Sequence, residues 1–242
     1  MTLYISTSDK PAALAERAVE VLEVLGAKAI ESYGRFLLVL AGGNTPRDTY
    51  TLWARTTRLD WSRVVLIFGD ERCVPPEDGQ SNYRMVAESL LAGLSAQPEL
   101  LRMEGEHADP AQAARNYDYA LRKLVGAGGS LHVALLGIGT DGHTASLFPG
   151  MPAVREADAW CVSSPGPAGS PTRLTLTVPC LHATRKLMFL AAGADKAPVL
   201  QRVMEGKLDP ENLPAQFFLR DERLNVNLLM DETAAARLNR RE

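Results

Sequence analysis

The chain has 242 residues, of which 46% are hydrophobic and 23% are charged. That content is enough for one substantial core, so we expect a single domain over residues 1–242. The formal net charge of −3 offers no general attraction to nucleic acid or to an anionic membrane, which argues against both as partners. An anionic small molecule would therefore have to be bound by a local group of cations.

The cysteines and the N-terminus point to a reducing compartment. Cys73, Cys161 and Cys180 are odd in number and widely spaced, which fits neither a disulfide framework nor a structural zinc site. The first ten residues lack the apolar segment of a secretory signal, and the longest apolar runs are too short to cross a bilayer. We expect a cytoplasmic protein, with a monomer as the simplest assembly and a weak dimer left open.

Short runs rich in Leu, Val, Ile and Phe are typical of buried strands. Helical patterns separate several of them; the first has apolar residues every three or four positions between Leu14 and Leu25. This alternation predicts an α/β fold, a Rossmann-like open and mostly parallel sheet flanked by helices, with a smaller added α/β portion. The predicted strands cover residues 3–6, 36–41, 64–68, 131–138, 186–191 and 226–230.

The second half of the chain carries two further strand patterns, at residues 159–163 and 173–178. The Gly, Pro and Ser content of residues 163–171 cannot hold regular structure, so we interpret that segment as a mobile flap or connector. Residues 231–242 predict a final helix that frays.

A helix start is indicated at Asp109, which can cap the first turn, with Pro110 at a position that suits proline. Gln112 stands where it can complete a capping box, and Gly126 is expected to end the helix.

Ligands of open parallel sheets bind at the carboxyl ends of strands, and three predicted strands are followed by unusual loops. After the strand at 36–41 come Gly42, Gly43, Asn44 and Thr45, then a helical pattern at 47–54. Glycines let backbone N–H groups approach an anion, and a helix N-terminus adds its positive dipole end. The pattern predicts phosphate binding, with a plain tight turn as an equal alternative; it is neither a dinucleotide fingerprint nor a P-loop.

The second loop follows the strand at 64–68 and holds Asp70, Glu71 and Arg72. Charged groups at the end of a buried strand cost free energy unless they are paired or face a cleft. The loop therefore predicts either ligand contacts or a structural Asp–Arg or Glu–Arg pair. We set aside the neighbouring Cys73 as a nucleophile, because no partner histidine is indicated.

The third loop follows a strand pattern over residues 131–136 and places Asp141 and His143 on either side of one glycine. The carboxylate can fix the orientation or tautomer of the imidazole while the other ring nitrogen meets substrate. A surface histidine with no catalytic part is the alternative. Arg173 and Lys196 lie downstream as cations for an anionic group, although either can be an ordinary solvated charge.

These loops, in this order, resemble those of 6-phosphogluconolactonases in the glucosamine/galactosamine-6-phosphate isomerase superfamily. The resemblance covers about residues 37–200 and is carried by GGNTP (42–46), GDERCVP (69–75), SNY (81–83) and above all GIGTDGHTASLFP (137–149). It implies hydrolysis of 6-phospho-D-glucono-1,5-lactone to 6-phospho-D-gluconate, a step of the oxidative pentose phosphate pathway.

The resemblance also implies roles for the loop residues. His143 would be the base that activates water, Asp141 would orient it, and Arg72 would stabilise negative charge or help to hold the substrate. No metal or other cofactor is implied, and the histidines at 107, 132, 143 and 182 lack close metal-ligand spacing. The residues implied in substrate and phosphate binding are Gly42, Gly43, Asn44, Thr45, Asp70, Arg173 and Lys196.

Two other functions stay open at this stage. In the related glucosamine-6-phosphate deaminases the histidine is followed by a segment with an extra acid, whose place Phe148 takes in this chain. A deaminase or isomerase activity would have Asp70 abstract a carbon-bound proton. A non-catalytic sugar-phosphate sensor is the second alternative, and it predicts binding without turnover.

Overall fold

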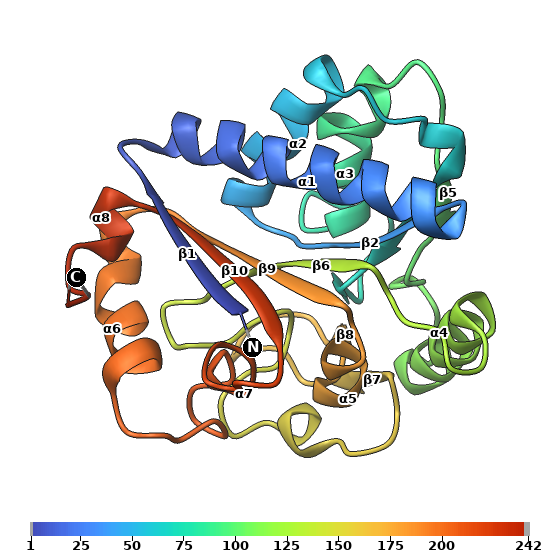
Figure 1. Cartoon of the computed structure of the whole chain (residues 1–242). Helices are drawn as coiled ribbons and strands as arrows, with labels where there is room; N and C mark the ends of the chain where they lie inside the picture. Colours follow the sequence, from blue (N-terminus) through green and yellow to red (C-terminus); the bar gives the residue numbers. More distant parts are fainter. Residues whose placement is uncertain (1, 240–242) are drawn as a thin grey trace.

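The computed structural model describes residues 2–239. Its main feature is a seven-stranded sheet in which every neighbouring pair is parallel, in the order β1-β10-β9-β6-β2-β3-β5 (Figure 1). The predicted α/β class with an open parallel sheet is thereby confirmed. The strands are β1 Thr2–Ser8, β2 Phe36–Leu40, β3 Val64–Phe68, β5 Glu99–Leu101, β6 Val133–Gly137, β9 Lys186–Ala191 and β10 Asn225–Asp231.

Every residue of β2 and β3 is buried, because helices cover the sheet on both faces. Such strands carry continuous apolar runs instead of alternating ones, which is why the sequence located them well. In Figure 1 the helices α1 (Pro11–Tyr33), α2 (Asn44–Thr56) and α3 (Asn82–Ser89) lie together on one side of the sheet, and α6 (Ala197–Glu205) lies on the other. The predicted apolar stripe of α1 faces the core, where Leu14 and Leu22 are fully buried.

A second, antiparallel sheet forms the smaller portion that the sequence predicted, in the order β4-β8-β7. It consists of β4 (Asp70–Arg72), β7 (Cys161–Ser164) and β8 (Arg173–Leu176), with α4 (Pro110–Val125) packed against β7 and β8. β4 occupies a stretch where a loop was expected. The strand predicted at 173–178 ends early, because Thr177 caps the short helix α5 (Val178–His182).

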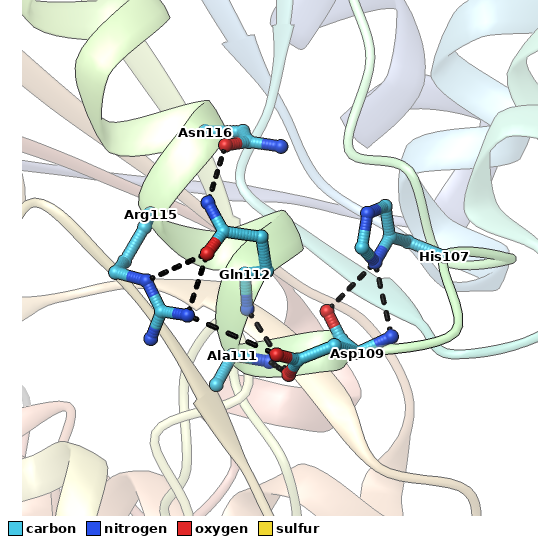
Figure 2. Close-up of polar contacts among 6 residues, drawn as sticks. All are labelled: His107, Asp109, Ala111, Gln112, Arg115 and Asn116. Atoms are coloured by element: carbon cyan, nitrogen blue, oxygen red, sulfur yellow. Dashed lines mark hydrogen bonds and ion pairs between the residues drawn. The ribbon is translucent and has the colours of Figure 1, made fainter.

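The start of α4 is capped as predicted, but by one half of a capping box only (Figure 2). The Oδ1 atom of Asp109 accepts two backbone N–H groups of the first turn, at 2.9 and 3.2 Å. The side chain of Gln112 turns instead to Asn116, to which its Nε2 donates at 2.8 Å. The N–H of Asp109 donates to Nδ1 of His107 at 3.0 Å, so the imidazole replaces the expected Gln contact.

The predicted C-terminal helix is wrong in extent. Asp231 ends β10 and its side chain accepts the N–H of Ala234 at 2.7 Å, so that α8 covers only Glu232–Ala235. Residues 240–242 of the predicted helix lie outside the described residues. The remaining short elements are α7 (Gln216–Leu219) and 3-10 turns at Trp61–Arg63, Leu91–Gly93, Pro152–Arg155 and Ala194–Lys196. Over residues 2–239, no helix has both the length and the apolar character needed to cross a membrane.

Two buried tyrosines hold the strand ends from which the first two loops depart. The hydroxyl of Tyr50, in α2, donates to the carbonyl of Ala41 and accepts its N–H, both at 3.0 Å. The hydroxyl of Tyr117, in α4, makes the same pair of bonds to Phe68, both at 2.9 Å. The two hydroxyls thus pair with the backbone N–H and C=O groups at these strand ends. They fix the direction in which the chain leaves β2 and β3.

Candidate active site

The sheet order brings the predicted site residues to one edge. Strands β9, β6, β2 and β3 are neighbours and parallel, so the segments that follow them meet at their carboxyl ends. The small sheet adds a further residue, because β8 pairs with β4 there. The residues gathered in this way are Gly42, Gly43, Asn44, Thr45, Asp70, Arg72, Asp141, His143, Arg173 and Lys196.

His143 and Asp141 form the pair that their spacing predicted. Nδ1 of His143 lies 2.6 Å from Oδ1 of Asp141, which also accepts the backbone N–H of His143 at 3.1 Å. Burial alone would raise the pKa of Asp141, but the hydrogen bond and charge of His143 outweigh it and leave that pKa below its usual value. The ring of Phe148 packs against the imidazole, with 4.6 Å between centroids.

The other imidazole nitrogen, Nε2, is free to meet a ligand. None of the residues 2–239 hydrogen-bonds to it, and the His143 side chain is 30% exposed. In the neutral tautomer that donates from Nδ1 to Asp141, Nε2 presents a lone pair.

The glycine before this pair is a steric requirement. A Cβ at position 139 would lie 2.0 Å from Nδ1 of His143 and 2.7 Å from Oδ1 of Asp141. Only glycine leaves the imidazole and the carboxylate the space in which they meet. Further along the loop, Ala145 holds a left-handed φ of 48°, a conformation that costs free energy for a residue with a side chain.

The first loop has the geometry of an anion-binding turn. Gly43 has a φ of 99° and stands at the N-cap of α2 without any side chain to cap it, and a Cβ there would meet no atom within 4 Å. The helix starts at Asn44, three residues earlier than predicted. Its first N–H groups have no acceptor within the helix and remain available to a ligand. Asn44 is exposed and Thr45 half-buried beside them.

The second loop separates its charged residues by strand alternation. Asp70 and Arg72 lie on one face of β4, and Glu71 points to the other. Glu71, 2% exposed, accepts the backbone N–H groups of Asn82 and Tyr83 at 2.7 and 2.8 Å, so it caps the start of α3. Burial raises the pKa of Glu71, against the effect of these bonds. The alternative of an Asp–Arg or Glu–Arg pair is wrong: within the described chain neither acid forms an ion pair with an arginine.

Arg72 and Arg173 stand opposite each other in the small sheet. Directly opposed residues of antiparallel strands share a face, and like charges there destabilise the pair. Arg173 is only 7% exposed, and its burial, together with the charge of Arg72, lowers its pKa. Its guanidinium donates to the carbonyl of Pro171 at 2.6 Å, while Nε of Arg72 is buried without a partner among the described residues. An anion bound here would offset this repulsion.

Lys196 lies in the 3-10 turn that follows β9, at the same edge of the sheet. Its Nζ is 3.2 Å from Oδ2 of Asp195, and the side chain is 23% exposed. A contact of this ammonium with a ligand stays a prediction.

Sequence reasoning missed Ser146, Asn82 and Thr175. The first two donate to the carboxylate of Asp70, and Thr175 accepts the N–H of Ser146 at 3.1 Å. Ser146 and Asn82 stand inside the strings that the resemblance singled out, so a signal for them was present, whereas Thr175 carried none. Within residues 2–239 there is no group of three or more His, Cys, Asp or Glu placed to hold a metal ion.

Comparison with known proteins decides the family. The model of the family described as glucosamine-6-phosphate isomerases/6-phosphogluconolactonase matches residues 9–226. The chain belongs to this family. A 6-phosphogluconolactonase of Synechocystis sp. is 36% identical over 209 residues, which cover 84% of this chain and 86% of that protein. A 6-phosphogluconolactonase of Rhizobium meliloti is 34% identical over 227 residues, covering 91% and 95%.

Among solved structures, the 6-phosphogluconolactonase from Trypanosoma cruzi superimposes with a TM-score of 0.86 at 25% identity, over 98% of this chain and 97% of that one. The chain therefore shares the fold of this structure over nearly the whole length of both chains.

Proposed function

We propose that the chain hydrolyses 6-phospho-D-glucono-1,5-lactone to 6-phospho-D-gluconate, within the oxidative pentose phosphate pathway, with His143 as the base. The observation that carries this proposal is the imidazole held at Nδ1 by Asp141, with Nε2 unpaired among the described residues, at the sheet edge where two arginines face each other. The relatives named 6-phosphogluconolactonase support the choice of substrate.

The reaction needs a base, a water molecule and stabilisation of charge at one carbonyl. Nε2 of His143 takes a proton from water as the water oxygen attacks C1 of the lactone, which leaves negative charge on the carbonyl oxygen. Asp141 stabilises the imidazolium that forms, and Arg72 stabilises the oxyanion. The bond between C1 and the ring oxygen then breaks, and the imidazolium returns its proton to that oxygen.

The phosphate end of the substrate supplies the binding free energy that positions C1. We assign it to the N–H groups of Gly43, Asn44 and Thr45, with Arg173 and Lys196 as cations. Anchoring the non-reacting end in this way converts binding free energy into orientation at the reacting carbon.

Replacing the base tests the proposal. The variant His143→Ala should hydrolyse the lactone about 10²- to 10⁴-fold more slowly and unfold at the same temperature as the wild type. The lactone is made in situ and its decay is followed above the spontaneous rate, with His107→Ala as a control outside the site. An unchanged rate in His143→Ala would eliminate the assigned role.

The family description also covers isomerases, so a deaminase or isomerase activity has to be tested. Phe148 argues against it, because an apolar ring packs on His143 at the place where the deaminases carry an acid. Ammonia release from glucosamine 6-phosphate would reverse this conclusion. Binding of 6-phosphogluconate without any turnover of the lactone would instead support the sensor.

A further inference from the structure

Asp70 lies where the three loops of the site come together. We propose that Asp70 is a positioning residue for lactone hydrolysis. Its carboxylate ties the third loop, which carries His143, and the first loop, residues 42–45, to the small sheet; these are called the catalytic loop and the phosphate loop below. This inference rests on the proposed function. It replaces the substrate-binding role that the sequence suggested for Asp70 and the proton-abstracting role of the isomerase alternative.

Both oxygens of the Asp70 carboxylate are engaged by neutral donors. Oδ2 accepts from Oγ of Ser146 at 2.6 Å, and Oδ1 accepts from Nδ2 of Asn82 at 3.1 Å. Asp70 is 9% exposed, and Ser146 and Asn82 are both buried. Hydrogen bonds to an ionised acceptor are short and strong in such surroundings, so this arrangement is well suited to fix two segments in place.

Through Ser146, the carboxylate fixes the part of the catalytic loop that follows His143. Ser146 stands three residues after His143, and its N–H donates at 3.1 Å to Oγ1 of Thr175, the residue that pairs with Asp70 in the small sheet. The hydroxyl and the backbone of Ser146 are thus both held by that sheet. The strained φ of Ala145, just before it, persists because the chain is fixed on this side.

Through Asn82, the same carboxylate sets the surface on which the phosphate loop lies. Nδ2 of Asn82 also donates to the backbone carbonyl of Asp70, at 2.9 Å, which locks the amide in one orientation. Gly42 packs so closely against this amide that a Cβ at position 42 would lie 2.2 Å from its Oδ1. A shift of Asn82 would therefore move the turn that presents Gly43 and the first N–H groups of α2.

These contacts suit a permanent acceptor better than a group that takes up and returns a proton. Nδ2 of Asn82 can only donate, so a proton on Oδ1 of Asp70 would set a donor against a donor and break that tie. A base must also reach a reacting atom of the substrate, and His143 meets this need: its side chain is 30% exposed and its Nε2 has no hydrogen-bond partner among residues 2–239.

Ser146→Ala separates the two roles, because it removes one donor and leaves the carboxylate in place. We expect it to lower kcat/KM for the lactone by about tenfold, the effect of losing one hydrogen bond to a charged group. Asp70→Asn should lower it at least as much, and the double variant should be no slower than the slower single variant, because both changes break the same tie. The acidic limb of the pH–rate profile, which reports the base, should keep its midpoint in Ser146→Ala and in Asp70→Asn.

Ser164→Ala is the matched control, since it removes a buried serine hydroxyl on the small sheet that has no hydrogen-bond partner among the described residues. It should retain the wild-type rate. A wild-type rate for Ser146→Ala, together with an inactive Asp70→Asn, would overturn the positioning role. So would rate losses that multiply in the double variant. A shifted midpoint of the acidic limb of the pH–rate profile in Asp70→Asn would overturn it as well. If Asp70→Asn does not fold, the rate of Ser146→Ala decides alone. A wild-type protein without turnover would refute the proposed function instead, and the two failures are therefore distinguishable.

Discussion

Gly139→Ala is the sharpest single test of the His143–Asp141 geometry, because it adds one methyl group and changes no charge. That methyl carbon would lie 2.0 Å from Nδ1 of His143 and 2.7 Å from Oδ1 of Asp141, where van der Waals contact begins only beyond about 3.5 Å. The imidazole must therefore move by more than about 1 Å or lose its carboxylate partner. A displacement of that size costs about 10²-fold in rate, and we expect kcat to fall at least that much.

The same substitution should leave folding and phosphate binding almost unchanged. Gly139 does not have a left-handed φ, so the added methyl group strains no backbone torsion of that kind. The atoms it meets belong to side chains that are 30% and 48% exposed and can turn toward solvent. The assay follows decay of lactone made in situ, with product affinity and thermal unfolding measured on the same preparation. Gly79→Ala is the control, because a Cβ there meets nothing within 4 Å. Wild-type kcat in Gly139→Ala would refute the reasoning that an ordered imidazole–carboxylate pair limits the rate.

Two further predictions concern the anion site and the dependence of stability on pH. Lys196→Ala should weaken binding of 6-phosphogluconate by roughly tenfold or more, as expected for loss of one charge-assisted contact. The control Lys28→Ala, on α1, should keep the wild-type affinity. Equal affinities of the two variants in calorimetry would mean that the phosphate lies elsewhere. Burial, with the charges of Arg185 and Arg35, lowers the pKa of His132 to about 4 from 6.5. Between these two pKa values His132 is protonated in the unfolded chain but not in the folded protein. The free energy of unfolding should therefore fall by up to about 3 kcal/mol as the pH drops from about 7 to about 4. The non-titrating variant His132→Gln should lose correspondingly less in urea unfolding over that range, and equal losses would show that His132 is not responsible.

The central strands and the chemistry of the third loop were predictable from local sequence. The strands at 64–68 and 186–191 were located to the residue, because a strand buried on both faces is a continuous apolar run bounded by polar residues. The carboxylate–imidazole pair was predictable for the same reason: Asp141 and His143 are two residues apart, so a local turn is enough to join them.

Short elements stabilised by distant partners were not predictable. β4 contains only Asp70, Glu71 and Arg72, which read as loop residues, and it is a strand because β8 pairs with it from about a hundred residues away. The prediction that Gln112 completes a capping box was wrong for a similar reason. The N–H of Asp109 donates to His107, which lies outside the helix. The predicted extent of the final helix was wrong because β10 extends to Asp231, whose side chain then caps the short helix α8.

The sequence by itself determined which chemical groups are present and which strands carry them to the carboxyl edge of the sheet. Only the tertiary structure decided that Arg173 faces Arg72, that Gly42 rests on Asn82, and that Ser146 and Asn82 share one carboxylate. The physical reason is the range of the interactions. Hydrophobic periodicity and turns depend on residues close together in the sequence. Hydrogen bonds and charge contacts between loops form only where the sheet order brings distant segments together.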